Sequence, residues 1–235
     1  MSFRALDAGE ILGTLERLRQ RIEERFPGSG LGRVATDLLG VGRECATGAA
    51  GLGRPHWPLR LGTGVVGLVA FAAIVWALLR AARLVDTDQR IGVDDFLSGV
   101  ESVINDLVFL GIGTWFLASI EGRFKRRRAL RQLHVLRSIA HVVDMHQLTK
   151  DPDRLLAPAP DTASSPMRRM SRADLGRYLD YCSELLSVTG KLAALYVQHF
   201  QDPAVMQSVN EIEDLTSGLS RKIWQKITLL ERADR

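Results

Sequence analysis

The stretch from His134 to His146 holds three of the chain's five histidines, together with an arginine and an aspartate. Imidazole, guanidinium and carboxylate groups at this density are the side chains that metal sites and acid–base catalysis use. If the stretch is an α-helix, a turn of ~100° per residue gathers His134, Arg137, His141 and Asp144 on one polar face. His146 falls instead on the apolar side, among Leu136, Ile139, Val142 and Val143.

Helix geometry disfavours a metal site on this polar face. His134 and His141 are seven residues apart, so at ~1.5 Å per residue they lie about 10 Å apart along the helix axis and cannot both bind one ion. A stripe of ion-paired and hydrogen-bonded side chains is the favoured interpretation, and we assign no metal or cofactor. A membrane-bound hydrolase or nuclease that uses residues 134–146 is the least favoured function, because the sequence contains no P-loop, dinucleotide-binding or nucleophile-elbow motif.

The elements that position this stretch include a membrane-type apolar run. Residues 61–79 form 19 consecutive uncharged positions, and a helix of that length is about 28 Å long, close to the ~30 Å hydrocarbon core of a bilayer. We therefore expect residues 61–79 to span a membrane. A stripe of small residues along this helix predicts a close seam with a second span or with another subunit: Thr63, Gly67, Ala70, Ala73 and Ala77.

A second apolar run covers residues 107–120 and is too short to cross a bilayer by itself. Extending it back to residue 100 gives a full span, 100–120, but places Glu101, Asn105 and Asp106 in the outer part of the membrane. Polar groups there cost a few kcal/mol unless they are paired or face water, which makes these three intramembrane functional candidates. The alternative is that the bilayer edge falls near Asp106.

Basic residues near the ends of the two runs predict the orientation. Three arginines lie between the runs, whereas ten basic residues precede the first run or follow the second. The positive-inside rule then places both termini in the cytosol and a short external loop over 83–98, in a cell inner membrane. We expect anionic lipid head groups to contact the cluster Arg123, Lys125, Arg126, Arg127 and Arg128. Nucleic acid is disfavoured as a partner because no aromatic residues alternate with these cations as in single-strand binders.

The remaining chain reads as helices on the cytosolic side. Residues 1–58 contain N-terminal helices, with an apolar stripe from Ile11 to Phe26, and a flexible tether over 47–58. Residues 121–150 form a basic juxtamembrane stalk helix, and 151–171 is a flexible, proline-rich linker. Residues 172–235 show near-heptad apolar spacing on both sides of a short turn, which predicts a helical hairpin with coiled-coil packing. The fold class is an all-α membrane protein: a two-transmembrane hairpin with a cytosolic helical bundle that includes a long C-terminal antiparallel helix pair.

These patterns favour a membrane-anchored helical interaction protein, a scaffold or sensor, over an enzyme. We expect a homo-oligomer, because two spans alone form a thin structure, and a cytosolic protein partner for the bundle. The alternative is a homo-oligomeric ion channel or pore gated by the cytosolic domain, with Glu101, Asn105 and Asp106 near its outer mouth.

Overall fold

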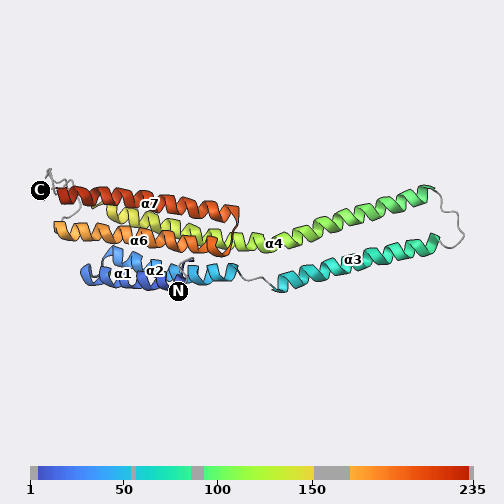
Figure 1. Ribbon diagram of the computed structural model, residues 1–235, viewed down its shortest axis with the longest axis horizontal. Helices are drawn as coiled ribbons and strands as arrows, with labels where there is room; N and C mark the ends of the chain where they lie inside the picture. The colour runs from blue at the N-terminus through green and yellow to red at the C-terminus, as the bar shows by residue number, and fades with distance from the viewer. Residues whose placement is uncertain (1–4, 54–56, 86–92, 151–169, 233–235) are drawn as a thin grey trace. The chain divides into compact units, whose positions relative to one another are not determined.

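The computed structural model describes residues 5–53, 57–85, 93–150 and 170–232 (Figure 1). Every regular element within these ranges is an α-helix, which confirms the all-α class. The helices are α1 (Ala8–Arg25), α2 (Gly30–Leu52), α3 (Trp57–Val85), α4 (Val93–Leu148), α6 (Arg172–His199) and α7 (Pro203–Arg232). The chain divides into two compact units, which are Met1–Gly53 with Arg126–Arg235, and Arg54–Lys125.

Helix α6 is central to the first unit, because α1, α2 and α7 all pack on it (Figure 1). Ser171 caps its N-terminus by accepting a hydrogen bond from the Asp174 backbone N–H at 3.1 Å. Helices α6 and α7 are antiparallel and occupy the region of the predicted hairpin. The connection between them is short, and the Asp202 side chain accepts hydrogen bonds from Ala204 N (3.0 Å) and Val205 N (3.3 Å) at the start of α7.

The N-terminal helices differ in how well the sequence pattern located them. The stripe on α1 is buried at Ile11, Leu15, Leu18 and Ile22, while Phe26 lies just beyond the helix and packs edge-on against Tyr178, with ring centroids 5.4 Å apart. Helix α2 extends to Leu52, into residues expected to form a flexible tether. The reason is close packing, since a Cβ on Gly48 would lie 3.2 Å from Tyr196 Oη of α6.

The C-terminal half of α4 completes the core of the first unit. Its Ala129, Leu133, Leu136, Ala140 and Val143 are fully buried. The expected stalk over 121–150 is thus helical up to Leu148, and one face of it from residue 129 onward is core. The linker predicted over 151–171 falls mostly on 151–169, which lie outside the described residues.

The second unit contains α3 and the N-terminal part of α4. By length and composition alone, one helical segment in the described residues, Ile104–Leu148, is able to cross a membrane, and Leu61–Trp76 is a shorter apolar helix. Helix α3 continues to Val85 and α4 begins at Val93, so helix ends occupy much of the loop predicted over 83–98, and residues 86–92 lie outside the described residues.

The small-residue stripe on α3 is covered only in part. Ala70 is buried and Thr63 and Gly67 are half-buried, whereas Ala73 is exposed. Ile74, the residue after Ala73, is half-buried instead. Gly67 and Ile74 line one hollow together with residues of α4. Because 3.6 residues make one helical turn, position 74 follows position 70 on the same face more closely than position 73 does.

Candidate functional site

The basic cluster after the apolar part of α4 contains two kinds of cation. Lys125 is only 8% exposed, and its Nζ lies 2.8 Å from Glu121 Oε1 one turn earlier. Arg126 points to the start of α7, where its Nη2 lies 2.7 Å from Asp202 Oδ2 and its Nε donates a hydrogen bond to the same oxygen at 2.8 Å. These two residues are therefore engaged within the protein.

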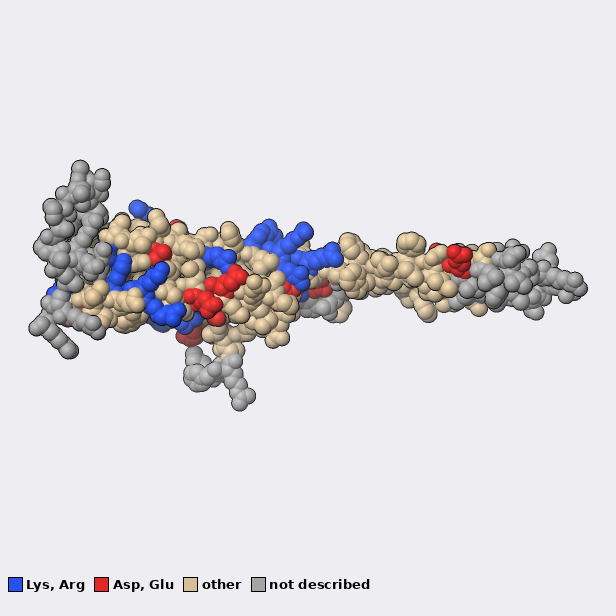
Figure 2. Space-filling model, turned by 90° about the horizontal axis from the view of Figure 1, so that it is seen from above, with Lys and Arg blue, Asp and Glu red and all other residues tan. Residues whose placement is uncertain are grey.

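Arg123 at the end of the second unit and Arg127 and Arg131 at the start of this part of the first follow one another at four-residue spacing in the sequence, and all three are exposed. We call these three residues the arginine stripe. Arg131 Nε donates to the Arg127 carbonyl at 3.3 Å, and the Arg123 guanidinium lies 5.1 Å from the centroid of the Phe116 ring. Arg128 is also exposed, and among the described residues neither Arg127, Arg128 nor Arg131 has an acidic partner. Figure 2 shows Lys and Arg side chains gathered on the first unit and largely uncharged surface over the second.

Asp202 joins α4 to the α6–α7 turn. Its side chain is 8% exposed, and burial by itself raises the pKa of a carboxyl group. The hydrogen bond and charge of Arg126, together with the backbone N–H groups of Val205 and Ala204, outweigh burial, so the pKa of Asp202 lies below its usual value. The carboxylate thus caps α7 and holds α4 at the same time.

Two members of the polar stripe on α4, Arg137 and Asp144, have partners within the protein. Arg137 forms an ion pair with Glu211 of α7. Asp144 accepts a hydrogen bond from Gln147 Nε2 at 2.6 Å, and the buried Gln147 in turn accepts one from Lys226 Nζ of α7 through its Oε1 at 2.8 Å. Among the described residues, no group of three His, Cys, Asp or Glu side chains is arranged to hold a metal ion.

Among the histidines of this stretch, His134 and His141 are exposed and His146 is half-buried. The ring of His146 lies against the start of α2, where a Cβ on Gly30 would approach its Cε1 to 2.4 Å. Burial, followed by the charges of Arg33 and Lys150, lowers the pKa of His146. Of its expected apolar neighbours, Leu136 and Val143 are fully buried, Ile139 is half-buried and Val142 is 44% exposed, so the apolar arc is narrower than the sequence suggested.

The three intramembrane candidates, Glu101, Asn105 and Asp106, are exposed on α4 in the second unit. No ion pair joins either carboxylate to another described residue. They lie within two helical turns of one another, and nothing in the described part of the chain covers them. The role of these three residues therefore depends on whether lipid, water or another subunit surrounds the second unit.

Known proteins offer no identification. Comparisons with protein-family models, curated proteins and solved structures found no match to this chain. The assignment of function therefore rests on the chemistry of the groups described above. An exposed arginine stripe is suited to phosphate or carboxylate ligands, because guanidinium groups donate paired hydrogen bonds to such anions.

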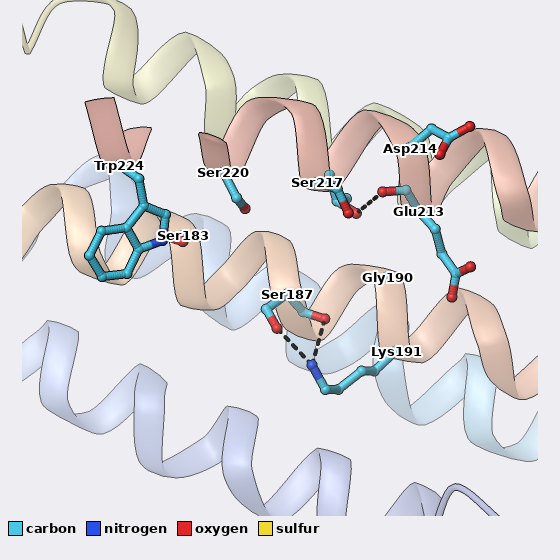
Figure 3. A pocket seen from close by; sticks show the side chains of 10 residues that line it. Ser183, Ser187, Gly190, Lys191, Glu213, Asp214, Ser217, Ser220 and Trp224 are labelled. Carbon is cyan, nitrogen blue, oxygen red and sulfur yellow. Dashed lines mark hydrogen bonds between the residues drawn. The ribbon is translucent and has the colours of Figure 1, made fainter. Parts of the chain in front are cut away.

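One feature of the first unit was missed by the sequence analysis, namely a polar groove of about 640 Å³ between α6 and α7. Figure 3 shows side chains of both helices that line it, among them Ser183 of α6 and Ser217 and Trp224 of α7, and the Lys191 ammonium directed at Ser187 of its own helix. The only sequence signal was the serine pair at four-residue spacing within the apolar pattern of α6. That pair was not interpreted, because an isolated serine on a helix is usually solvent-facing.

Proposed function

We propose that this chain is a membrane-anchored helical interaction protein, a scaffold or sensor. In this proposal α3 and the N-terminal part of α4 form a two-span hairpin in a cell inner membrane. The packed helices of the first unit and both termini lie in the cytosol. The observation that carries the proposal is the exposed apolar surface of the second unit.

That surface is too large to remain in water. Fifteen apolar side chains of the second unit are each at least 47% exposed: Leu61, Val65, Val66, Leu68, Val69, Phe71, Trp76, Leu79, Ile104, Leu107, Val108, Phe109, Ile112, Trp115 and Phe116. Full burial of one such side chain contributes ~1.5–3 kcal/mol, so leaving half of each in water costs on the order of 10 kcal/mol in total. This is comparable to the whole folding stability of a domain, ~5–15 kcal/mol, and a bilayer removes the cost.

The arginine stripe supports the same proposal because it directly follows the apolar part of α4. Guanidinium groups at this depth lie at the phosphates of anionic lipids, with their apolar stems along the acyl boundary. Of the five cations expected at the head groups, Lys125 and Arg126 are engaged with Glu121 and Asp202. We therefore assign lipid contact to Arg123, Arg127, Arg128 and the further residue Arg131.

The membrane assignment is tested by washing membranes that contain the full chain with alkaline carbonate. We expect the protein to stay in the pellet and to need detergent for release. Recovery of a monodisperse protein in the aqueous wash would refute the proposal, because an integral hairpin cannot leave the bilayer without detergent.

The lipid assignment is tested separately on detergent-purified full chain by native mass spectrometry with added phosphatidylglycerol. Arg127→Gln/Arg131→Gln should lose most bound lipid. The matched control Arg33→Gln/Arg43→Gln removes two exposed arginines of α2 and should retain it. Equal loss in both variants would show that net charge, rather than the stripe, holds the lipid.

The second candidate, a homo-oligomeric ion channel, is favoured by the exposure of Glu101, Asn105 and Asp106 on α4. Polar groups in a lipid-facing segment are costly unless they line water. The test combines the mass of the protein in detergent with ion flux into liposomes. Flux that Asp106→Asn and Glu101→Gln reduce would replace the scaffold proposal with the channel, whereas an oligomer without flux supports the scaffold.

A further inference from the structure

The part of α4 that belongs to the first unit has an apolar face that points away from the core. Val135, Val142 and Met145 are 39%, 44% and 65% exposed, although Val143 is fully buried. At ~100° per residue these three side chains and Ser138 fall within an arc of about 80°, on the side of the helix opposite the buried residues. We call Val135, Ser138, Val142 and Met145 the outer face of α4.

The exposed residues of this part of α4 carry no permanent charge. From residue 134 to the end of the helix, the exposed positions are His134, Val135, Ser138, His141, Val142, Met145 and Leu148. In α1, by contrast, six of the nine exposed residues are arginine or glutamate. A helix face that meets water normally carries charged side chains, whereas the core of an interface is depleted of them and enriched in methionine. The outer face of α4 therefore has the composition of a covered surface.

The residues of the outer face repeat at seven-residue spacing. Val135 and Val142 occupy one heptad position, and Ser138 and Met145 occupy the position three residues later, which is the pattern of two helices packed side by side. Valine at the first of these positions favours a parallel, two-stranded contact. The Ser138 hydroxyl donates a hydrogen bond to the His134 carbonyl at 3.0 Å, so its donor is already paired when such a contact forms.

An identical copy of the chain matches this face in both charge and spacing. Charged residues that would select a different partner, or would repel a second copy, are missing from it. In a parallel pair related by a twofold axis each residue meets its own counterpart, so valine packs on valine and methionine on methionine. We infer that two copies of this chain associate in parallel through the outer face of α4.

The parallel orientation follows from the proposed membrane anchoring, on which this inference rests, because copies in one membrane all point the same way. The outer face spans ~15 Å of helix. Its three apolar side chains bury less than the ~1,000 Å² that a stable interface in solution needs. The pair therefore depends on the high local concentration that a shared membrane provides.

Cysteine cross-linking in membranes tests the pairing, because the native Cys45 and Cys182 are fully buried. Val135→Cys and Val142→Cys are made separately in the full chain, and Asn210→Cys, at an exposed position of α7, is the control. Oxidation with copper phenanthroline should join each α4 variant into a species of twice the chain mass, several-fold faster than the control. Cross-linking at both α4 positions requires a parallel pair in register, because a disulfide needs Cβ atoms about 4 Å apart.

A second comparison uses charge. Met145→Lys, added to Val142→Cys, places two ammonium groups together in the contact and should reduce the cross-linked fraction several-fold. Met206→Lys is the matched control, because Met206 is 42% exposed on α7, and it should leave the cross-linked fraction unchanged. Both methionines are exposed, so neither substitution should prevent folding.

Cross-linking of Asn210→Cys as fast as that of the α4 variants would overturn the inference, because it would indicate random collision. A cross-linked species with a mass other than twice that of the chain would also overturn it, because another protein would then cover the face. A chain that stays in the membrane pellet but does not cross-link at 135 and 142 retains the membrane proposal and refutes the pairing. If the alkaline wash releases the chain, the membrane proposal fails separately, and the same cross-links on the released protein decide the pairing.

Discussion

Replacing Asp202 by alanine removes two interactions of one buried carboxylate, and the structure allows each to be weighed. The cap on α7, with N···O distances of 3.0 and 3.3 Å, is worth ~1 kcal/mol. The ion pair with Arg126, at 2.7 Å, is worth less than ~1 kcal/mol, because the Arg126 side chain is 47% exposed and solvent screens its charge. We expect Asp202→Ala to lower the free energy of unfolding by ~1–2 kcal/mol.

Two further variants separate these contributions. Asp202→Asn keeps an oxygen that can cap α7 but removes the charge, so it should cost less than ~1 kcal/mol. Arg126→Gln should cost a similar amount, because the carboxylate keeps its backbone hydrogen bonds. In a double-mutant cycle with Arg126→Gln and Asp202→Asn, we expect a coupling energy of ~0.5–1 kcal/mol.

Urea unfolding of the full chain in mild detergent, followed by far-ultraviolet circular dichroism, measures these differences. The folded-state pKa of Asp202 lies below its ordinary value of 3.8, so its stabilising charge is present above pH 3.8 and is lost as the pH falls further. The gap between wild type and Asp202→Asn should therefore narrow in acid. If Asp202→Asn is as destabilising as Asp202→Ala at neutral pH, the cap argument is wrong.

The remaining predictions concern the packed helices of the first unit. Gly42→Leu should lower the free energy of unfolding in urea by ~1–3 kcal/mol, because a Cβ at this position would lie 2.9 Å from Leu12 Cδ2. The control Gly40→Leu should not destabilise the protein, because a Cβ there would have nothing within 4 Å. Cys45 and Cys182 are fully buried, and burial raises their pKa values to about 11 and about 12. Iodoacetamide should therefore modify the two thiols only after denaturation. Rapid labelling of the native chain would contradict this prediction. The folded-state pKa of His146 lies below its ordinary value of 6.5, so the free energy of unfolding should be constant above pH 6.5 and fall as the pH drops below it. His146→Gln should make this dependence of the unfolding free energy on pH weaker.

The sequence located helices well where apolar spacing alone determines burial. The stripe on α1 and the start of α6 at residue 172 are examples, because both follow from the local spacing of apolar residues. It failed at the end of α2, where Gly48 and Ala49 looked like a tether. Their burial results from close approach to Tyr196, a residue about 150 positions later in the chain, which no local pattern reveals.

The candidate site shows the same division between local and long-range information. The cluster at 123–128 was visible as a run of basic residues, but its separation into engaged and exposed cations was not. Arg126 is engaged because the α6–α7 turn places Asp202 beside it, whereas Arg127 is exposed and Ala129, two residues later, is fully buried. The polar groove between α6 and α7 was hidden for a similar reason, since it depends on how those two helices pack.

The positive charge of this chain is concentrated in one short segment, and its position helps to choose among the proposed partners. Six lysine and arginine residues and one glutamate lie within 121–131, so this segment carries +5 while the whole chain carries +4. The rest of the chain is therefore close to neutral and slightly acidic. These cations directly follow an apolar stretch on one helix, as expected at a bilayer surface. Outside that segment positive and negative charges nearly balance, so an attraction for anionic lipid would be confined to this one short part of α4.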